Sequence, residues 1–478
     1  MNLKSSLKNP IFKTICKIAD ELNYPTYVIG GWVRDLLINK KHKKTDIDFL
    51  CVGSGIKLAK KVAERLGSKA NYKVFTNFGT AMINFKEETY EFVGARKESY
   101  RANSRKPIVE NGTLQDDQNR RDFTINALAI QLNKSDFGEL IDPFSGKKDL
   151  ENKIIRTPLN PDITYSDDPL RMMRAIRFAT QLGFKIEKES LDSIKQNMER
   201  LNIVSIERIT DEFNKIMLCS NPSIGINILH KTGLLQQFLP EVCNLEGVDV
   251  KNGHAHKDNF YHTLKVLDNI SKNSDNLWLR WAALLHDIAK PKTKKYYKKQ
   301  GWTFHGHEFF GSKMVPNIFR NLKLPLNEKM KYVRKLVLLH LRPIVLAQDI
   351  VTDSAVRRLL FDAGNDIDDL MILCDADITS KNPKKVAKYL NNFQLVRKRL
   401  KEVEEKDHIR NWQPPINGDE IMDFFDIKAG KEIGIIKNAI KEAILDGEIK
   451  NEKKEALEFM IKKGAEISLS TKERKDNP

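Results

Sequence analysis

The chain has 478 residues, enough for three or four domains, and its hydrophobic fraction of 41% is ordinary for a globular protein. Lysine and arginine total 81 against 64 acidic residues, and the net charge of +17 favours a polyanionic partner over an excess of lysine that serves solubility alone. The five cysteines are scattered without a Cys-x-x-Cys pair, and no apolar run approaches the length of a membrane span. These features argue against a disulfide framework, a zinc knuckle and a membrane protein, and they predict a cytoplasmic location.

The stretch from Tyr27 to Val52 has the clearest chemical pattern in the chain. Residues 27–29 form a short apolar run that is predicted to be a strand, Gly30 and Gly31 follow, and residues 32–38 are predicted to be a helix. A glycine pair lets the backbone approach a ligand closely, and the N–H groups at the start of a helix point toward an anion. This segment is therefore predicted to bind phosphate.

A second strand is predicted at residues 46–52. Strand alternation places Asp46 and Asp48 on one face and the apolar side chains on the other. The two carboxylates lie about 6.6 Å apart along such a strand and repel each other unless a divalent cation lies between them. Oxygen ligands favour magnesium or manganese, so the pattern predicts metal-assisted phosphoryl or nucleotidyl transfer.

Two further strands are predicted at residues 78–85 and 90–93. In the second of them Glu91 faces away from its aromatic neighbours. Glu91 either supplies a third carboxylate to the metal site or is a solvated residue at an edge, and the sequence supports both equally. The polar residues 94–118 show little periodicity and are predicted to form a mobile loop.

Residues 120–127 read R-R-D-F-T-I-N-A. Their apolar positions predict the start of a helix, and Arg120 and Arg121 add positive charge where a helix already favours anions. The charge at this point either suits an anionic ligand or belongs to solvated arginines at the start of a capped helix.

A helical region then opens with the string D-D-P-L-R. Asp168 suits an N-cap, with Pro169 at the first helical position. Arg171 lies three residues further on the same face, and an Asp acceptor beside an Arg donor fork can also read the polar edge of a base. Capping and base reading are both open for Asp168. Arg174 and Arg177 continue a basic stripe along the helix.

Histidines gather in the third region of the chain, where seven of the ten fall between His254 and His340. A lone histidine most often fills a core, but here an ordered series of histidines and aspartates falls on successive predicted helices. The series is His262, His286, Asp287, His307, His340 and Asp377. Asp375 competes with Asp377 for the last position, and the sequence alone leaves that choice open.

The stretch G-G-x-V-R-D with Asp46-x-Asp48, and the string R-R-D-F-T-I-N-A, resemble the signatures of class II tRNA nucleotidyltransferases, the CCA-adding enzymes, and of the related bacterial poly(A) polymerases. These proteins belong to the DNA polymerase β-like nucleotidyltransferase superfamily. The resemblance implies an α+β fold in which a head with a mixed sheet and flanking helices precedes an all-α neck, an HD-type body and a tail. The implied domains are a catalytic head (1–150), a base-selecting neck (151–245), an HD domain (246–395) and a tRNA-binding tail (396–478).

The same resemblance implies template-independent addition of C, C and A to the 3′ end of tRNA from CTP and ATP. Asp46, Asp48 and Glu91 would be catalytic, with Mg²⁺ ions on Asp46 and Asp48. The nucleotide would be bound by Gly30, Gly31, Arg34, Arg121, Asp122, Asn126, Asp168, Arg171, Arg174 and Arg177. The family motif E-D-x-x-R begins here with Asp167 instead of Glu, a departure that leaves Asp168 and Arg171 intact.

The histidine series resembles that of an HD domain, a helical metal-dependent phosphohydrolase fold. The resemblance implies a second divalent metal site, with a degenerate structural fold as the alternative. Its ligands would be His262, His286, Asp287 and Asp377, with His307 and His340 able to hold a further ion. Lysine-rich stretches such as Lys290–Lys299 would hold the tRNA backbone through its charge. We expect no obligate protein partner.

Three alternatives to full CCA addition stay open. A poly(A) polymerase shares the head motifs but does not need CTP, and a partial enzyme adds only CC or only A. A tRNA-binding chaperone with inactive sites belongs to another functional class. The complete histidine series favours CCA addition over poly(A) synthesis, and the intact carboxylates of Asp46 and Asp48 argue against a chaperone.

Overall fold

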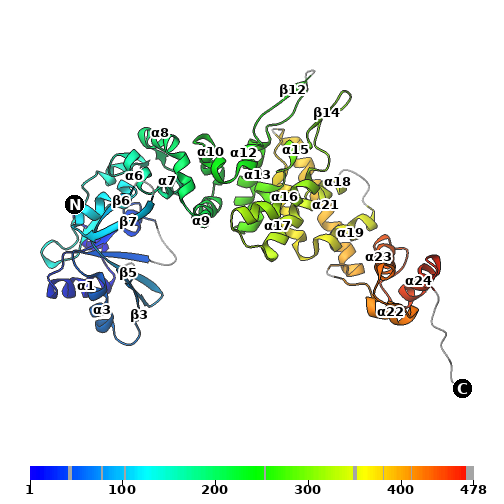
Figure 1. The fold of residues 1–478 in the computed structure, drawn as a ribbon, viewed down its shortest axis with the longest axis horizontal. Helices are drawn as coiled ribbons and strands as arrows, with labels where there is room; N and C mark the ends of the chain where they lie inside the picture. Colours follow the sequence, from blue (N-terminus) through cyan, green and yellow to red (C-terminus); the bar gives the residue numbers. More distant parts are fainter. Residues whose placement is uncertain are drawn as a thin grey trace. The chain divides into compact units, whose positions relative to one another are not determined.

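The computed structural model describes residues 1–40, 46–76, 79–101, 104–251, 254–347, 352–380, 382–410 and 412–469 (Figure 1). The chain divides into two compact units, Met1–Cys243 and Asn244–Pro478. The finer division into head, neck, HD domain and tail stays a prediction. Within the described ranges, no helix has both the length and the apolar character needed to span a membrane.

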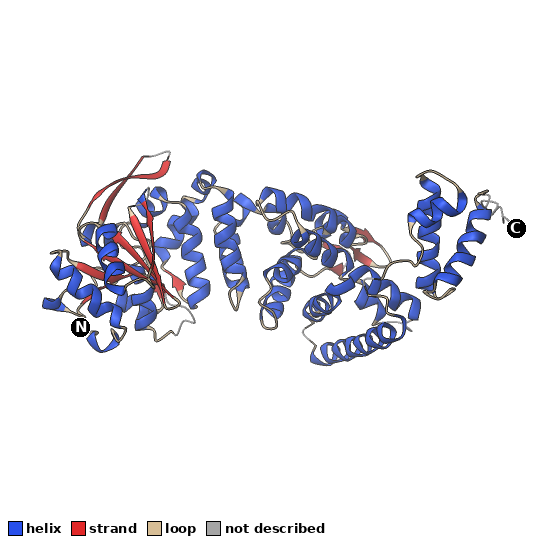
Figure 2. Cartoon of the chain, turned by 90° about the horizontal axis from the view of Figure 1, so that it is seen from below, coloured by secondary structure: helices blue, strands red, loops and turns tan. Residues whose placement is uncertain are grey.

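The first unit is built on a seven-stranded mixed sheet (Figure 2), as the sequence predicts. The strand order is β3-β4-β5-β2-β1-β8-β9, and β2 and β5 are parallel whereas the other neighbours are antiparallel. The strands are β1 (Thr26–Ile29), β2 (Asp46–Cys51), β3 (Asn71–Phe75), β4 (Thr80–Phe85), β5 (Glu88–Gly94), β8 (Ala129–Gln131) and β9 (Leu140–Ile141). The parallel pair at the centre therefore carries both predicted acidic strands.

An aromatic core lies on the apolar face of the two acidic strands. Phe49 of β2 stacks on Phe92 of β5 with ring centroids 5.0 Å apart, and Phe12 packs edge-on against Phe49 at 6.0 Å. Phe12 belongs to α1 (Pro10–Glu21), and α1 packs against α3 (Gly55–Leu66), which lies on β4 and β5. Burial of each such ring stabilises the fold by about 1.5–3 kcal/mol. This burial leaves Asp46 and Asp48 on the opposite face.

The predicted loop at residues 94–118 is wrong. The chain forms the antiparallel hairpin of β6 (Arg96–Arg101) and β7 (Ser104–Asn111), followed by the short helix α4 (Leu114–Asn119). Thr113 and Asp116 form a capping box at the start of α4. The hairpin is built from a polar sequence without an alternating apolar face, so the period-two signal of a strand is absent.

The predicted helix after Arg121 is also wrong. Residues Thr124–Asn126 form a single 3₁₀ turn, and β8 follows and pairs antiparallel with β1. Phe123, Ile125 and Leu128 are all fully buried. Sheet pairing and burial on more than one side decide the conformation here, against the local helical spacing.

Helices make up most of the remainder of the first unit. They are α2 (Gly31–Leu37), α5 (Gly146–Asn152), α6 (Pro161–Asp167), α7 (Leu170–Leu182), α8 (Lys188–Gln196), α9 (Ile206–Met217), α10 (Pro222–Lys231), α11 (Leu234–Phe238) and α12 (Pro240–Cys243). The long helix α7 packs against α9 and α10. A two-residue parallel pair, β10 (Ile154–Ile155) with β11 (Lys185–Ile186), interrupts the predicted all-α neck.

The second unit is predominantly helical, as predicted, with two short hairpins. Its first helices are α13 (Asn259–Ser271), α14 (Leu277–Leu285), α15 (Lys290–Thr293), α16 (His307–Asn321), α17 (Glu328–Leu339) and α18 (Arg342–Leu346). The hairpins pair β12 (Val250–Lys251) with β13 (His254–Ala255), and β14 (Lys295–Tyr297) with β15 (Gly301–Thr303). Helix α14 is buried over most of its surface, including Trp281, which makes it the central helix of this unit.

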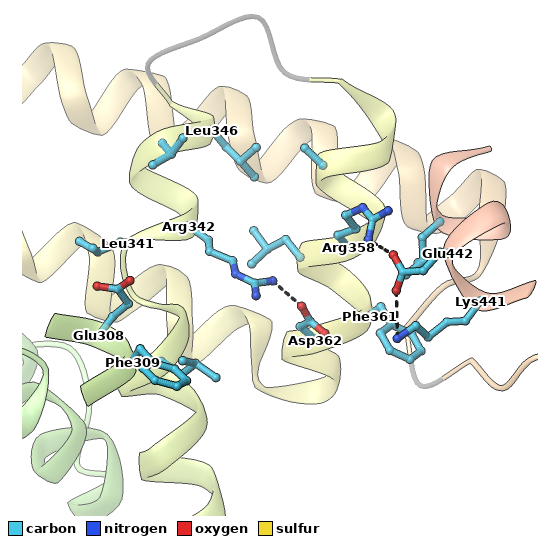
Figure 3. A pocket seen from close by; sticks show the side chains of 15 residues that line it. Glu308, Phe309, Leu341, Arg342, Leu346, Arg358, Phe361, Asp362, Lys441 and Glu442 are labelled. Carbon is cyan, nitrogen blue, oxygen red and sulfur yellow. Dashed lines mark hydrogen bonds and ion pairs between the residues drawn. The ribbon is translucent and has the colours of Figure 1, made fainter. Parts of the chain in front are cut away.

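The later helices of this unit are α19 (Asp353–Ala363), α20 (Ile367–Asp377), α21 (Pro383–Asp407), α22 (Gly418–Phe425), α23 (Lys431–Asp446) and α24 (Lys453–Glu466). Helix α23 packs against α19, where Arg358 forms ion pairs with Glu442 and Asp446. A cavity of about 780 Å³ lies at this junction (Figure 3), and its rim carries the Arg342–Asp362 ion pair. None of the predicted site residues lines this cavity.

Candidate nucleotidyl-transfer and HD sites

The glycine pair lies where β1 ends and α2 begins. Gly30 has φ +83°, a conformation that favours glycine. A Cβ atom on Gly30 would lie 3.2 Å from Nη1 of Arg121 and 3.5 Å from Oδ2 of Asp48. Gly30 therefore allows the turn and also leaves space beside a carboxylate and a guanidinium group, as a phosphate-binding turn requires.

Three carboxylates converge beside this turn. Asp48 is the direct register partner of Glu91 in the parallel β2–β5 pair, and Asp46 lies two residues earlier on the same face of β2. Burial raises the pKa of Asp48. Arg121 offsets part of this rise and Asp46 adds to it, so the pKa of Asp48 lies above its usual value. Partial burial, and then Asp48, raises the pKa of Glu91. These mutually repelling oxygen groups suit a divalent cation, and the register favours Glu91 as the third carboxylate over a solvated edge residue.

Two arginines of the predicted site meet at Asn126. Arg34 donates through Nη1 to Oδ1 of Asn126 at 2.9 Å and through Nε to Asp35 at 2.7 Å. Arg121 donates through Nη1 to the backbone carbonyl of Asn126 at 3.4 Å. The 3₁₀ turn that replaces the predicted helix thus brings both guanidinium groups to the end of β1.

Asp122 joins this turn to α7. Its carboxylate accepts hydrogen bonds from Nδ2 of Asn126 at 3.0 Å and from Nε of Arg174 at 2.8 Å. Burial alone would raise the pKa of Asp122, but Arg174 and Asn126 stabilise the carboxylate and hold its pKa below the usual value. Asp122 therefore acts as an anion that orients Arg174.

The predicted basic stripe of α7 is only partly available to a ligand. Arg174 forms an ion pair with Asp122 at 2.6 Å, and Arg177 forms one with Glu212 at 2.7 Å. The side chain of Arg174 keeps 34% of its exposure, whereas that of Arg177 keeps 13%. Sequence reasoning did not single out Glu212, although its place on the buried face of the amphipathic helix α9 was a usable signal.

Helix α7 begins at Leu170, one residue later than predicted. Oδ1 of Asp168 accepts a hydrogen bond from the N–H of Leu170 at 3.2 Å, so the capping contact exists. Arg171 is buried and donates to the carbonyl of Arg120 at 2.6 Å. Arg171 and Asp167 line a small cavity of about 170 Å³. A role of Asp168 and Arg171 in base selection stays a prediction.

The histidine series converges in the second unit. Nε2 of His262 lies 2.9 Å from Asp377 and 3.4 Å from Asp287, and Nε2 of His286 lies 3.3 Å from Asp287. Nε2 of His307 lies 3.2 Å from the other oxygen of Asp287. Asp287 is thus shared by two metal-sized clusters, one with His262 and His286 and one with His307 and His340.

Each of these histidines is anchored through Nδ1. The Nδ1 atoms lie 2.7–2.8 Å from Thr379 Oγ1 and from the backbone carbonyls of Ala283, Phe304 and Val337. The anchoring aims every Nε2 atom at the aspartates, the usual arrangement around a metal ion. Nε2 of His286 is buried without a hydrogen bond to any described residue, so the donor set fits a metal.

The charges of this centre compensate one another. Burial lowers the pKa of His286, but Asp287 and Asp377 raise it overall to about 10. Burial and the neighbouring His286 lower the pKa of His340 to about 3. Lys290 Nζ lies 2.6 Å from Asp287, so this lysine belongs to the centre as well. Lys290 and the raised pKa of His286 thus place positive charge beside the aspartates. A bound divalent metal ion would supply positive charge to the same aspartates.

The choice between Asp375 and Asp377 follows from α20. The carboxylate of Asp377 lies 2.9 Å from His262, whereas that of Asp375 pairs with Arg397 at 2.5 Å. The two residues lie on different sides of the end of one helix, and Asp377 is the one placed at the histidines.

A mixed sheet that presents carboxylates beside a glycine turn, joined to a helical HD centre, defines a nucleotidyltransferase with an appended HD domain. The sequence matches three protein families: "Poly A polymerase head domain" over residues 26–156, "Probable RNA and SrmB-binding site of polymerase A" over 183–245, and "HD domain" over 259–382.

Individual relatives agree with these matches. An A-adding tRNA nucleotidyltransferase of Deinococcus radiodurans is 31% identical over 345 residues, 70% of this chain and 76% of that protein. A multifunctional CCA protein of Pseudomonas fluorescens is 33% identical over 311 residues, 63% of this chain and 70% of that protein. The chain belongs to the class II tRNA nucleotidyltransferases, the family of the CCA-adding enzymes.

A solved structure shares the fold. The CCA-adding enzyme of Bacillus stearothermophilus in complex with CTP matches with a TM-score of 0.67 at 22% identity, over 96% of this chain and 99% of that chain. At this identity the likeness concerns the architecture alone, and it confirms the predicted order of a nucleotidyltransferase head and a helical body.

Proposed function

We propose that this chain adds C, C and A to the 3′ end of tRNA from CTP and ATP without a nucleic-acid template. One observation carries the proposal: Asp46, Asp48 and Glu91 share one face of the sheet beside Gly30 and Arg121. The relative named as a multifunctional CCA protein supports this reaction, and the A-adding relative supports tRNA as the substrate and the addition of A. The two-metal chemistry is part of the proposal.

In this proposal the acidic residues of the head site bind metal ions, and Gly30 and the arginines bind the phosphates of the nucleotide. When bound to Asp46 and Asp48, Mg²⁺ would acidify the 3′-hydroxyl of the primer and neutralise the triphosphate. Gly30 leaves room for a phosphate, and Arg121 supplies positive charge within reach of it. The side chain of Asn126 holds Arg34, and Asp117 together with the carbonyl of Asn126 holds Arg121, so these guanidinium groups need little reorganisation when the nucleotide binds.

Base selection is assigned to Asp168 and Arg171. A pocket that hydrogen-bonds the edge of a base leaves its own groups unpaired when a wrong base enters, at about 1–3 kcal/mol for each lost partner. Two such groups acting together exclude UTP and GTP. In this proposal Asp168 contacts the base in addition to accepting the hydrogen bond from the N–H of Leu170 at 3.2 Å.

The decisive experiment extends tRNA substrates that end before, within and after the CCA sequence. Each is incubated with CTP, ATP or both, with Mg²⁺, and its 3′ end is sequenced. We expect three additions to the shortest substrate with both nucleotides and none to the complete tRNA. Absence of any extension would refute nucleotide addition.

A-only addition is the second candidate, because the Deinococcus radiodurans relative is an A-adding enzyme. An A-adding enzyme would extend only the tRNA that already ends in CC, and it would leave CTP unused. Repeated additions from ATP alone would instead identify a poly(A) polymerase.

We also propose that the HD centre hydrolyses phosphate esters with a divalent metal. The support is the convergence of four anchored histidines on Asp287 and Asp377. The ligands would be those of the two clusters described above, and the bound metal would activate water for attack on phosphorus. Assays of metal content and of hydrolysis of a phosphomonoester or a 2′,3′-cyclic phosphate test this assignment.

We assign the binding of the tRNA backbone to exposed lysines. Of the segment Lys290–Lys299, Lys290 pairs with Asp287 and Lys294 with Asp249, so these two are engaged within the protein. The exposed remainder, Lys292, Lys295, Lys298 and Lys299, is available to phosphates. Binding through such contacts weakens steeply with salt, which a titration between low and physiological salt measures.

A further inference from the structure

One aromatic side chain lies among three guanidinium groups of the nucleotide site. The ring centroid of Phe178, on α7, is 5.1 Å from the guanidinium carbon of Arg34, 5.4 Å from that of Arg174 and 4.1 Å from that of Arg177. Phe178 is 6% exposed. All three distances fall in the range of a cation–π interaction, in which the negative face of a ring attracts a cation.

Each guanidinium group also forms an ion pair with a carboxylate. Arg34 pairs with Asp35, and Arg174 and Arg177 pair with the acids of separate elements described above. Three neighbouring cations repel one another, so they stay together only where negative groups surround them. Here a carboxylate pairs with each arginine, and the Phe178 ring lies within 5.4 Å of each guanidinium carbon.

The three arginines come from two parts of the site. Arg34 belongs to α2, directly after the glycine turn, whereas Arg174 and Arg177 belong to α7, one and two turns after Arg171. Phe178 also packs edge-on against Phe123, at 5.8 Å, in the string that carries Arg121 and Asp122. The ring therefore contacts the phosphate-binding part and belongs to the base-selecting helix.

We propose that Phe178 is a positioning residue that fixes α2 against α7 through these guanidinium groups, and so sets the distance between the triphosphate and the base. This inference rests on the proposed binding of CTP and ATP in the head. Phe178 does not contact the reacting atoms in this proposal. Its loss would let the phosphate and base sites move independently, which weakens nucleotide binding and selection together.

The test compares ring removal with ring retention. Phe178→Leu keeps an apolar side chain but removes the ring, and Phe178→Tyr keeps the ring. Phe319→Leu is the matched control, because Phe319 is a fully buried ring that packs on Trp278 and Trp281 in the second unit, which contains neither α2 nor α7. KM, kcat and misincorporation of UTP and GTP are measured at a temperature where melting curves show every variant to be folded.

We expect Phe178→Leu to raise KM for CTP and ATP about tenfold, with a smaller change in kcat and a clear gain of UTP or GTP incorporation. Phe178→Tyr should keep the wild-type values, and Phe319→Leu should lower the melting temperature without changing selection. Equal selection by Phe178→Leu and Phe319→Leu, or altered selection by Phe178→Tyr, would overturn the proposal.

Equilibrium binding of CTP and ATP to the full chain separates this inference from the proposed function. If wild type binds nucleotide but adds none to tRNA, the proposed reaction fails, and the loss of binding in Phe178→Leu still decides the role of the ring. If the affinities of wild type and Phe178→Leu are equal, the positioning role fails whatever the reaction is.

Discussion

Asp48 and Glu91 are direct partners across the parallel strands β2 and β5, although 43 positions separate them in the sequence. Antiparallel hairpins join sequence neighbours, but a parallel pair needs a crossover, which here includes α3 and the β3–β4 hairpin. The crossover places the third carboxylate on the same face as the Asp46–Asp48 pair. The acidic cluster of the head thus depends on topology as much as on the D-x-D motif.

Asp48→Ala should abolish nucleotide addition while tRNA binding persists, because tRNA contacts are spread over many lysines. The removed carboxylate lies beside the Gly30 turn, where no other side chain replaces it at that register position. Incorporation of radiolabelled CTP and ATP, and a binding assay with tRNA, measure the two effects. Glu64→Ala, at an exposed acid of α3, is the control. Activity within a few fold of wild type in Asp48→Ala would contradict the assignment.

Glu91→Gln should raise the Mg²⁺ concentration needed for half-maximal activity, with a smaller loss at saturating Mg²⁺ than Asp48→Ala shows. The amide keeps the shape of Glu91 but removes one negative charge from the cluster next to Asp48. A magnesium titration of the initial rate measures this shift. An unchanged titration would leave Glu91 as a solvated residue at the sheet.

Asp377→Asn should remove metal from the HD centre and with it any hydrolysis, whereas Asp375→Asn should keep both. Asp377 lies 2.9 Å from His262, but Asp375 is occupied by Arg397. Metal content after dialysis and hydrolysis by each variant give the comparison, with His286→Ala as a second loss variant. CCA addition should survive in all three, since the head site lies in the other unit. Equal hydrolysis by wild type and His286→Ala would point to a contaminant.

Replacement of both Asp168 and Arg171 by Ala should relax nucleotide choice, so that UTP or GTP is incorporated while the chemistry at Asp46 and Asp48 continues. A lost base-edge partner changes selection by about 5- to 150-fold, the ratio that corresponds to 1–3 kcal/mol. The hydrogen bond from Leu170 to Asp168 predicts a lower melting point as well. A double variant that melts earlier but still rejects UTP and GTP would assign Asp168 to capping alone.

Asp122→Asn should lower the free energy of unfolding by about 1.5–3 kcal/mol at pH 7, because a buried charge-assisted hydrogen bond to Arg174 is lost. The pKa of Asp122 is lower in the folded chain than its unfolded value near 3.9, so its stabilisation is fully present above that value. It is lost as the pH falls through the lower, folded pKa. Denaturant unfolding of both proteins from pH 7 to the acid limit measures this. A difference that does not shrink below about pH 4 would contradict it.

The predicted site residues that the structure brings together are those with a local signal. Gly30 and Asp48 belong to short patterns whose geometry follows from one strand and one turn, and the HD ligands mark the ends of periodic helices. Asn126 lies at the site because it belongs to the 3₁₀ turn before β8, which pairs with β1, and not because it lies on a helix as predicted. At Asn126 the helical spacing predicted the wrong secondary structure, and the role of this residue in nucleotide binding stays a prediction.

The pairing of each arginine with its acid could not be predicted, although the buried face of α9 marked Glu212 as an unusual position for an acid. Glu212, 35 positions further along the chain on α9, forms an ion pair with Arg177. Arg397, on the helix that follows α20, forms an ion pair with Asp375, which therefore points away from the histidines. These pairings follow from helix packing, which a single sequence does not encode in short patterns. The hairpin at β6 and β7 was missed because backbone pairing, and not an apolar face, identifies it.

The division of the chain between Cys243 and Asn244 has an evolutionary consequence. Every carboxylate and arginine assigned to the head centre precedes this boundary, and every ligand assigned to the HD centre follows it. Selection can therefore erase or retune one chemistry without passing through an intermediate that damages the other.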